Sequence, residues 1–355
     1  MPFHFFSSDE SAAPGYTTLL KFWDREPRQL RSGLRYGSPV IYKDPNDTSQ
    51  GFFKVERAIE DDAVKITNLW NEHYNQGGWS LRITPPFVID IIRNGTILII
   101  KHEKIVIASF VCRVLTGGVW CGKPITCGLL DGFVIHNNWR KKGLGSLLLA
   151  KMDMEAFRDS RLSKGLLMYF REIAIPETAL SQAPINISRY FVCKIAKIIR
   201  NSTLVSEPLP EMVAKIVGDV YDYILEKRND VSLMSKETTD KNVKWFLVAN
   251  FLIGIADTHR WEHGEPVYEV VFCSEISRPY FTNRVSGWKH IQQAATHLPT
   301  SRGLLYASNS LTRGWLFEDA GDGWTAAGGY LSCHVYNWMP PRFMDGVVLF
   351  PHSCI

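Results

Sequence analysis

The chain has 355 residues, of which 45% are hydrophobic and 12% aromatic, and 40 Lys and Arg stand against 36 Asp and Glu. This composition excludes a wholly disordered, collagen-like or low-complexity protein, and the length suggests about two domains or one duplicated domain. The net charge of +4 permits a local anion site. It does not fit a protein that coats nucleic acid, so we expect no nucleic-acid partner.

The cysteines and the apolar segments favour a cytoplasmic protein. The seven cysteines are an odd number and form no CxxC pair, which predicts buried free thiols in a reducing compartment. Residues 1–13 are too polar after Phe6 for a signal peptide. Asn250 interrupts the longest apolar run, residues 245–256, and no run reaches the ~20 residues that cross a bilayer. We therefore expect no stable membrane insertion.

In the first half, helical spacing of apolar residues predicts helices, and β-branched or continuous apolar runs predict strands. Residues 1–16 and 36–50 are rich in Pro, Gly, Ser and Asn and are expected to form irregular segments. The predicted helices are residues 60–73, 86–93 and 144–157. The predicted strands are residues 95–100, 104–115 and 165–175, and residues 123–136 are predicted to form a third strand or a pair of strands. The basic run at residues 194–200 is expected on a solvated helix face.

The second half follows a similar order of elements. Helices are predicted at residues 211–225, 238–246 and 288–298. Strands are predicted at residues 245–255, 267–274, 303–308, 314–318 and 330–338. Each half has the order helix–strand–strand–helix, and residues 208–210 mark a seam between them, so an α+β structure with an internal duplication is possible.

The most informative stretch is a basic, glycine-bearing turn between a predicted strand and a predicted helix. Arg140, Gly143 and Gly145 have the spacing Arg-x-x-Gly-x-Gly, and the helix begins at Leu144. Backbone N–H groups and the dipole at a helix N-terminus favour an anion, and three cationic side chains strengthen this preference. The turn therefore suits a polyphosphate such as the pyrophosphate of coenzyme A, although it could merely cap the helix. It does not fit the GxGxxG dinucleotide loop.

This turn resembles motif A of the GNAT acyltransferase superfamily. Other stretches are similar to one branch, the protein N-myristoyltransferases, and they follow that family's order along the chain. Residues 21–27, which contain Phe22-Trp23, resemble the segment that covers acyl-CoA. Asn71-Glu72-His73-Tyr74, residues 81–87 and, more weakly, residues 169–176 with Tyr190 resemble its peptide-facing region. Residues 321–323, 336–338 and 346–349 resemble its C-terminal strands.

The resemblance implies an α+β fold, a duplicated GNAT-like saddle-shaped mixed sheet flanked by helices. Residues 1–50 would form an N-terminal arm that covers acyl-CoA. Residues 51–205 would form the half that binds acyl-CoA, and residues 206–355 the half that binds the peptide. A monomer is expected.

The resemblance also implies direct transfer of a myristoyl group from myristoyl-CoA, the co-substrate, to the N-terminal glycine of a protein, without a metal. The backbone N–H groups of Gly132 and Phe133 would form the oxyanion hole, and the carboxylate of the last residue, Ile355, would be the base. The expected acyl-CoA contacts are Phe22, Trp23, Phe133, Val134, Ile135, Arg140, Lys141, Lys142, Gly143, Leu144, Gly145 and Ser146. The expected peptide contacts are Tyr74, Tyr169, Tyr190, Asp322 and Gly323.

Two departures from the family leave alternatives open. The family ends near Phe350, whereas this chain continues for residues 351–355, so either the Ile355 carboxylate still reaches the amine or Asp131 or His352 takes the proton. Residues 75–80 contain no acid, unlike the family's loop, which predicts little preference for lysine in the peptide. A short-chain GNAT N-acetyltransferase and a non-catalytic lipid- or peptide-binding protein are the alternative functions.

A metal site has weak support elsewhere in the sequence. His259 and His263 are four residues apart, but Gly264 and Pro266 favour a loop, and the HExxH order is absent. The GxSxG motif of serine hydrolases is also absent. We therefore expect neither metal chemistry nor a serine nucleophile.

Overall fold

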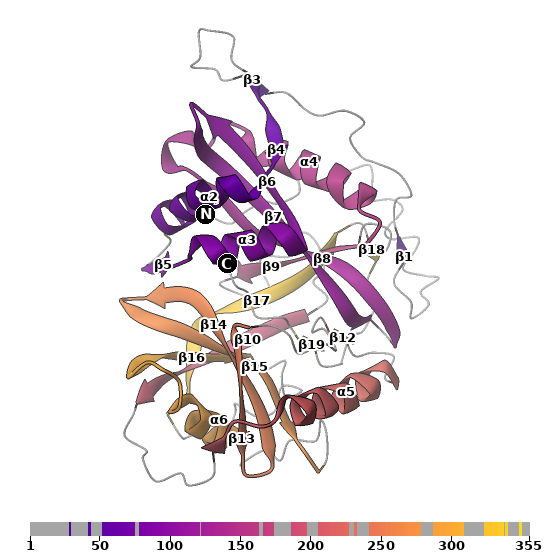
Figure 1. Cartoon of the computed structure of the whole chain (residues 1–355), viewed down its shortest axis with the longest axis vertical. Coiled ribbons are helices and arrows are strands. Elements are labelled where there is room, and N and C mark those ends of the chain that lie inside the picture. Colours follow the sequence, from indigo (N-terminus) through magenta and orange to yellow (C-terminus); the bar gives the residue numbers. More distant parts are fainter. Residues whose placement is uncertain are drawn as a thin grey trace.

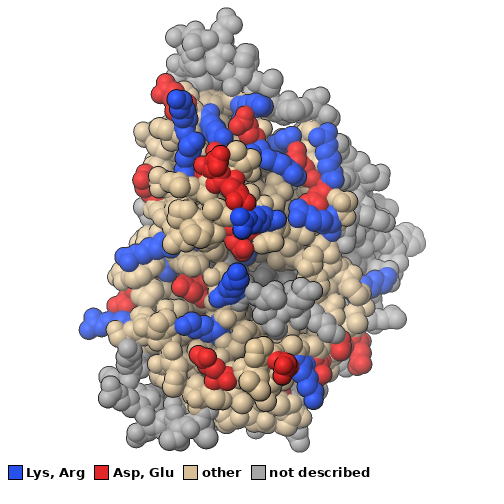
Figure 2. Space-filling view, in the orientation of Figure 1, with Lys and Arg blue, Asp and Glu red and all other residues tan. Residues whose placement is uncertain are grey.

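Most strands of the protein belong to one long mixed sheet. The structure, a computed structural model of the whole chain, describes residues 28–29, 42–43, 52–74, 78–120, 122–162, 166–173, 186–196, 205–226, 231–232, 241–277, 287–308, 323–336, 338–339 and 348–349. Within these ranges no helix is both long and apolar enough to cross a membrane. On the face shown in Figure 2, Lys and Arg lie interspersed with Asp and Glu, in keeping with the small net charge.

The elements have the following bounds (Figure 1). The helices are α2 (Ala63–His73), α3 (Pro85–Asn94), α4 (Leu144–Arg158), α5 (Pro210–Glu226) and α6 (Gly287–Ala295), with short 3₁₀ turns η3 (Glu60–Asp62) and η4 (Asn137–Trp139). The strands of the first half are β1 (Arg28–Gln29), β2 (Tyr42–Lys43), β3 (Phe52–Phe53), β4 (Val55–Arg57), β5 (Trp79–Leu81), β6 (Gly95–His102), β7 (Ile105–Trp120), β8 (Lys123–Ile135), β9 (Leu167–Ile173) and β10 (Asn186–Ala196). Those of the second half are β11 (Val205–Ser206), β12 (Val231–Ser232), β13 (Val243–Val248), β14 (Phe251–Glu262), β15 (Glu265–Glu275), β16 (Arg302–Ser308), β17 (Thr325–Tyr336), β18 (Trp338–Met339) and β19 (Val348–Leu349).

In the first half, helices pack on both faces of the antiparallel strands β6, β7 and β8. Successive side chains of a strand point to opposite faces. In β6, Ile97 and Ile99 pack with α2 and α3, whereas Leu98 and Ile100 pack with α4. Each helix buries one stripe of apolar residues against its face. The end of β8 and the start of α4 are therefore fixed between two cores.

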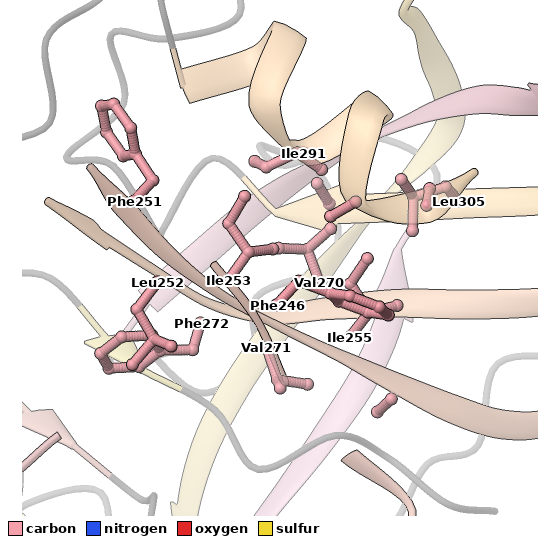
Figure 3. Packing of buried hydrophobic residues seen from close by; sticks show 14 of the residues in the cluster. Phe246, Phe251, Leu252, Ile253, Ile255, Val270, Val271, Phe272, Ile291 and Leu305 are labelled. Carbon is pink, nitrogen blue, oxygen red and sulfur yellow. The ribbon is translucent and has the colours of Figure 1, made fainter. Parts of the chain in front are cut away.

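The second half has a larger core around β13, β14 and β15. Ile291 of α6 lies on the same side of the strands as Ile253 and Leu305, whereas Leu252 and Phe272 point to the other side (Figure 3). The buried face of α5 belongs to this core as well. Both faces of the central strands are therefore covered by apolar packing.

The two halves repeat one arrangement. Three antiparallel strands are followed by a helix and by a fourth strand that runs parallel to the third. In the first half these elements are β6, β7, β8, α4 and β9, and in the second they are β13, β14, β15, α6 and β16. The α+β class and the duplicated mixed sheet flanked by helices are thereby confirmed, whereas the domain boundaries stay predictions.

The halves exchange their last strands. Strand β10 pairs with β16 and β17, although the sequence places it after β9. Strand β17 pairs in turn with β9 of the first half. The terminal regions add a further link, because β1 pairs with β18. A single sheet therefore runs through both halves.

Most predicted elements are present, but two predicted helices are wrong. Residues 243–246, expected at the end of the helix predicted over residues 238–246, belong instead to strand β13, in which valine, tryptophan and phenylalanine pair with β14. Residues 194–196, expected on a helix, belong to strand β10, because the hydrogen bonds of β16 and β17 fix that segment as extended. The predicted third strand or pair of the first half is the single strand β8. The expected strand at residues 314–318 lies outside the described residues.

Candidate active site

The site begins at an irregularity near the end of β8. The pairing of β7 with β8 shifts by one residue there, so that Gly132 and Phe133 together lie opposite Phe110. Gly132 has a φ of 55°, in the left-handed region that glycine adopts without a steric penalty. Such a bulge bends the strand and turns backbone groups away from the regular ladder. It contains both residues that were predicted to form the oxyanion hole.

A chain of buried hydrogen bonds supports this bulge from α2. The indole Nε1–H of Trp70 donates to Oγ of Ser109 at 2.7 Å, and the Ser109 hydroxyl donates to the carbonyl oxygen of Gly132 at 3.1 Å. Trp70 and Ser109 are both fully buried. Because a buried polar group without a partner is costly, these bonds hold the Gly132 peptide in one orientation.

Strands β8 and β9 stop pairing directly before the bulge. Their parallel register runs from Gly128↔Leu167 to Leu130↔Tyr169. Beyond it, β8 continues to Ile135, while β9 pairs only with β17 among the described strands. The backbone of β8 at the bulge is thus not tied to the neighbouring parallel strand, as a site for an extended ligand requires.

A carboxylate lies beside the bulge. Oδ1 of Asp131 accepts the backbone N–H of Gly132 at 2.9 Å, and Oδ2 lies 3.2 Å from a guanidinium nitrogen of Arg113. The side chains of Asp131 and Arg113 are each 15% exposed. Burial raises the pKa of Asp131, while the positive charges of Arg113 and of Arg260 in β14 oppose that rise. Two opposite effects therefore act on the pKa of this carboxylate: desolvation raises it, and two cations, one from each half, lower it.

The basic turn follows β8 and leads into α4. Arg140 is braced against the fold, because its Nε–H donates to the carbonyl of Ile135 at 3.1 Å and its terminal nitrogen donates to the carbonyl of His73 at 2.9 Å. Lys141 is exposed with a φ of 64°, and Nζ of Lys142 lies 4.3 Å from the centre of the Trp139 ring. The turn thus presents several cationic groups.

The start of α4 packs on the bulge. Gly143 is the N-cap and provides no side chain to cap the first amides of the helix. A Cβ on Gly145 would lie 2.9 Å from Cζ of Phe133, so only glycine allows this close approach. Leu144 is buried in the core, whereas Ser146 is exposed. The helix N-terminus, with its partial positive charge, is therefore next to the predicted oxyanion donors.

Two histidines pack together behind the basic turn. The rings of His73 and His136 are 3.9 Å apart between centroids. Nδ1 of His136 accepts the backbone N–H of Asn138 and so caps the short turn η4. Burial lowers the pKa of His73, and the positive charges of His136 and Arg140 lower it further, against the opposing effect of Glu72.

The predicted acyl-CoA contacts fall into one continuous segment at the end of β8, the turn and the start of α4. Val134 is buried against α2 and α3, on the opposite side from α4, so it faces away from the turn. Phe133 and Ile135 pack toward α4. Phe22 and Trp23 lie outside the described residues.

The predicted peptide contacts are spread more widely. Tyr74 ends α2, next to His73, whose carbonyl Arg140 binds. Tyr169 is buried and its ring stacks on His334 at 5.0 Å between centroids. The hydroxyl of Tyr190 donates to Glu269 of β15 at 2.7 Å. Gly323 lies in a turn near α6, with a φ of 88°. The predicted residues Asp322 and Ile355 lie outside the described part of the chain.

Apart from Asp131, the polar side chains around the bulge were not predicted from the sequence. Arg113 and Ser109 are polar residues in the predominantly apolar first part of strand β7, residues 105–115, and this contrast is the signal that could have marked them. Arg260 comes from β14, about 130 residues away in sequence, and only the fold brings it near Asp131.

Known proteins match this chain in fold rather than in sequence. No family model matches the chain, and no curated protein matches its sequence. Among solved structures, it is similar to N-myristoyltransferase from Saccharomyces cerevisiae with bound myristoyl-CoA, with a TM-score of 0.63 and 11% identity over 89% of this chain and 92% of that chain. A second such structure gives a TM-score of 0.61 and 13% identity over 89% of this chain and 85% of that chain. A third structure, with bound myristoyl-CoA and inhibitors, gives a TM-score of 0.58 and 12% identity over 89% of this chain and 86% of that chain. The chain therefore has the N-myristoyltransferase fold, as its sequence motifs predicted.

Proposed function

We propose that the protein transfers a myristoyl group from myristoyl-CoA to the amine of an N-terminal glycine. The observation that carries this proposal is the close packing of the start of α4, directly after the basic turn, against the Gly132–Phe133 bulge at the point where β8 and β9 stop pairing. This arrangement lies in a fold shared with a protein crystallised with myristoyl-CoA.

The basic turn suits the phosphates of coenzyme A. The uncapped amides at the start of α4 add the partial positive charge of the helix N-terminus. Lys141 and Lys142 add full charges, and a single charge about 4 Å from a phosphate in water contributes about 1 kcal/mol. Arg140 serves a different role in the proposal, because its bonds to β8 and α2 hold the turn in place.

The bulge suits the thioester. The backbone N–H groups of Gly132 and Phe133 would donate to the thioester oxygen as negative charge develops there. Losing one such donor typically costs ~3 kcal/mol of transition-state stabilisation. Since Asp131 now accepts the N–H of Gly132, the thioester oxygen would have to replace the carboxylate at this donor.

A long acyl chain is the expected donor group. Each buried CH₂ contributes about 0.8 kcal/mol, so a fourteen-carbon chain can bind ~10 kcal/mol more tightly than acetyl when it is fully buried.

The peptide would lie on the other side of the bulge from the acyl chain. The proposed peptide contacts are Tyr74, Tyr169, Tyr190, Asp322 and Gly323.

A mass-spectrometric transfer assay tests the proposal. The protein is mixed with glycine-initiated peptides and equimolar acetyl-, octanoyl-, myristoyl- and palmitoyl-CoA, with alanine-initiated peptides as the matched control. A gain of one myristoyl group on glycine alone supports the proposal. An acetyl gain would instead assign the chain to short-chain GNAT enzymes. Retention of acyl-CoA without any transfer would indicate a binding protein on an enzyme fold.

A further inference from the structure

The proposed reaction needs a base. An N-terminal amine has a pKa of about 8, so near neutral pH most of it is an ammonium ion that must lose a proton before it can attack. A base has to lie within hydrogen-bond reach of the amine, and the amine must approach the carbon whose oxygen the bulge binds. A base must therefore lie within a few ångströms of the N–H groups of Gly132 and Phe133.

We propose that the carboxylate of Asp131 is the base that takes this proton, an inference that rests on the proposed acyl transfer. Its Oδ1 lies 2.9 Å from the backbone nitrogen of Gly132, so it is already within hydrogen-bond distance of a predicted oxyanion donor. The side chain is 15% exposed, so it is not completely sealed from solvent.

Other buried carboxylates in the described part of the chain are engaged elsewhere. Asp62 pairs with Lys101 at 2.9 Å, near the start of α2. Glu269 accepts the hydroxyl of Tyr190, within the sheet of the second half. Asp131 is the carboxylate directly before the bulge, so the strand itself places it beside the reacting groups.

The same N–H group links acyl-CoA binding to the release of the base. Before the thioester arrives, Gly132 donates to Asp131; once the thioester oxygen accepts that N–H, the carboxylate loses a partner and can turn to the ammonium. Arg113, 3.2 Å away, keeps it in the site during this change. Acyl-CoA binding thereby prepares the base for the peptide.

The step balances as follows. Asp131 takes one proton from the ammonium, and the neutral amine attacks the thioester carbon. The C–N bond forms and the C–S bond breaks with its electron pair on sulfur. The departing thiolate takes the second proton of the attacking nitrogen, which gives the amide and the free thiol of coenzyme A. The protonated Asp131 then releases its proton to water.

The charges around Asp131 agree with this role. Arg113 of β7 lies 3.2 Å from the carboxylate, the positive charge of Arg260 in β14 acts on it, and the N–H of Gly132 donates to it. Burial outweighs these groups and raises the pKa of Asp131 above its ordinary value. A carboxylate with a raised pKa is a stronger base than a solvated one.

The test compares the whole protein with its Asp131→Asn variant in single-turnover myristoyl transfer. Asparagine keeps the size of the side chain and an oxygen that can accept the Gly132 N–H. Asp90→Asn, an exposed change on α3, is the matched control. Affinity for myristoyl-CoA is measured in parallel and should change less than about threefold, because both variants keep the basic turn and the fold.

We expect the Asp131→Asn variant to lose about 100-fold in rate near pH 7 and to recover as the pH rises past about 8, where the amine deprotonates by itself. Asp131→Ala should recover activity with added formate, which a purely structural role would not predict. Equal rates and pH profiles for the unchanged protein and Asp131→Asn would overturn the assignment. If deletion of residues 351–355 then abolished transfer, the end of the chain would be the base. No transfer by the unchanged protein would overturn the proposed function together with this inference.

Discussion

Replacing Ser109 with alanine removes one oxygen atom, yet it should destabilise the protein strongly. The Ser109 hydroxyl accepts from Trp70 at 2.7 Å and donates to Gly132 at 3.1 Å, and it is fully buried. Alanine leaves an indole N–H and a carbonyl without these partners. Each buried group left unsatisfied costs about 1–3 kcal/mol, so the expected loss for the two groups is about 2–6 kcal/mol. That is a large part of the 5–15 kcal/mol that typically stabilises a folded protein.

Urea unfolding of four proteins measures this loss: the unchanged chain, Ser109→Ala, Trp70→Phe and the double variant. In the double variant the indole donor is absent, so Ser109→Ala should cost ~1–2 kcal/mol less there than in the unchanged background. A Ser109→Ala loss below about 0.5 kcal/mol, or costs that simply add, would refute the hydrogen-bonded support of the bulge. The rate of acyl transfer should fall as well, because the Gly132 peptide loses its fixed orientation.

Three further predictions concern the turn and its supports. Lys141→Gly should leave stability unchanged or higher, since glycine favours a φ of 64°, yet calorimetry should show about fivefold weaker myristoyl-CoA binding at low salt, and unchanged binding would contradict the phosphate site. Gly145→Ala should cost about 1–3 kcal/mol in thermal unfolding, because its Cβ would lie 2.9 Å from Phe133; an unchanged Tm would show that the ring moves freely. Folding lowers the pKa of His73 through burial and through the charge of His136. The unfolded chain therefore binds more protons than the folded one below about pH 6.5, and the stability of the fold should decrease as the pH is lowered through this range. His73→Gln should flatten that fall, and an unchanged pH dependence would contradict it.

The turn at Arg140–Gly145 could be predicted because its information is local. Glycines, cations and the following helical spacing all lie within a few residues, so the sequence pattern alone indicates a strand, a basic turn and a helix. The helix α4 begins at Leu144, as the pattern predicted. The backbone donors at Gly132 and Phe133 could be assigned only through the family resemblance, because a backbone group leaves little trace in side-chain identity.

The polar network around the bulge depends on contacts between distant segments. Trp70 reaches Ser109 across 39 residues, and Ser109 reaches Gly132 across 23. No periodicity links such positions. The error at residues 243–246 has a different origin, since periodicity alone does not separate a short apolar run in a strand from one in a helix, although valine and aromatic residues favour the strand. Pairing with β14 decides between them.

The exchanged strands have a consequence for biosynthesis. When the first half has left the ribosome, β9 still lacks its neighbour β17, and β10 lacks both of its neighbours, because β16 and β17 are made more than 100 residues later. Open strand edges are templates for pairing with other chains. The nascent protein is therefore exposed to aggregation until its last third emerges, and the late, long-range closure of the sheet makes folding slow. A fragment that ends near residue 205 should be insoluble, whereas the same residues are protected in the complete chain.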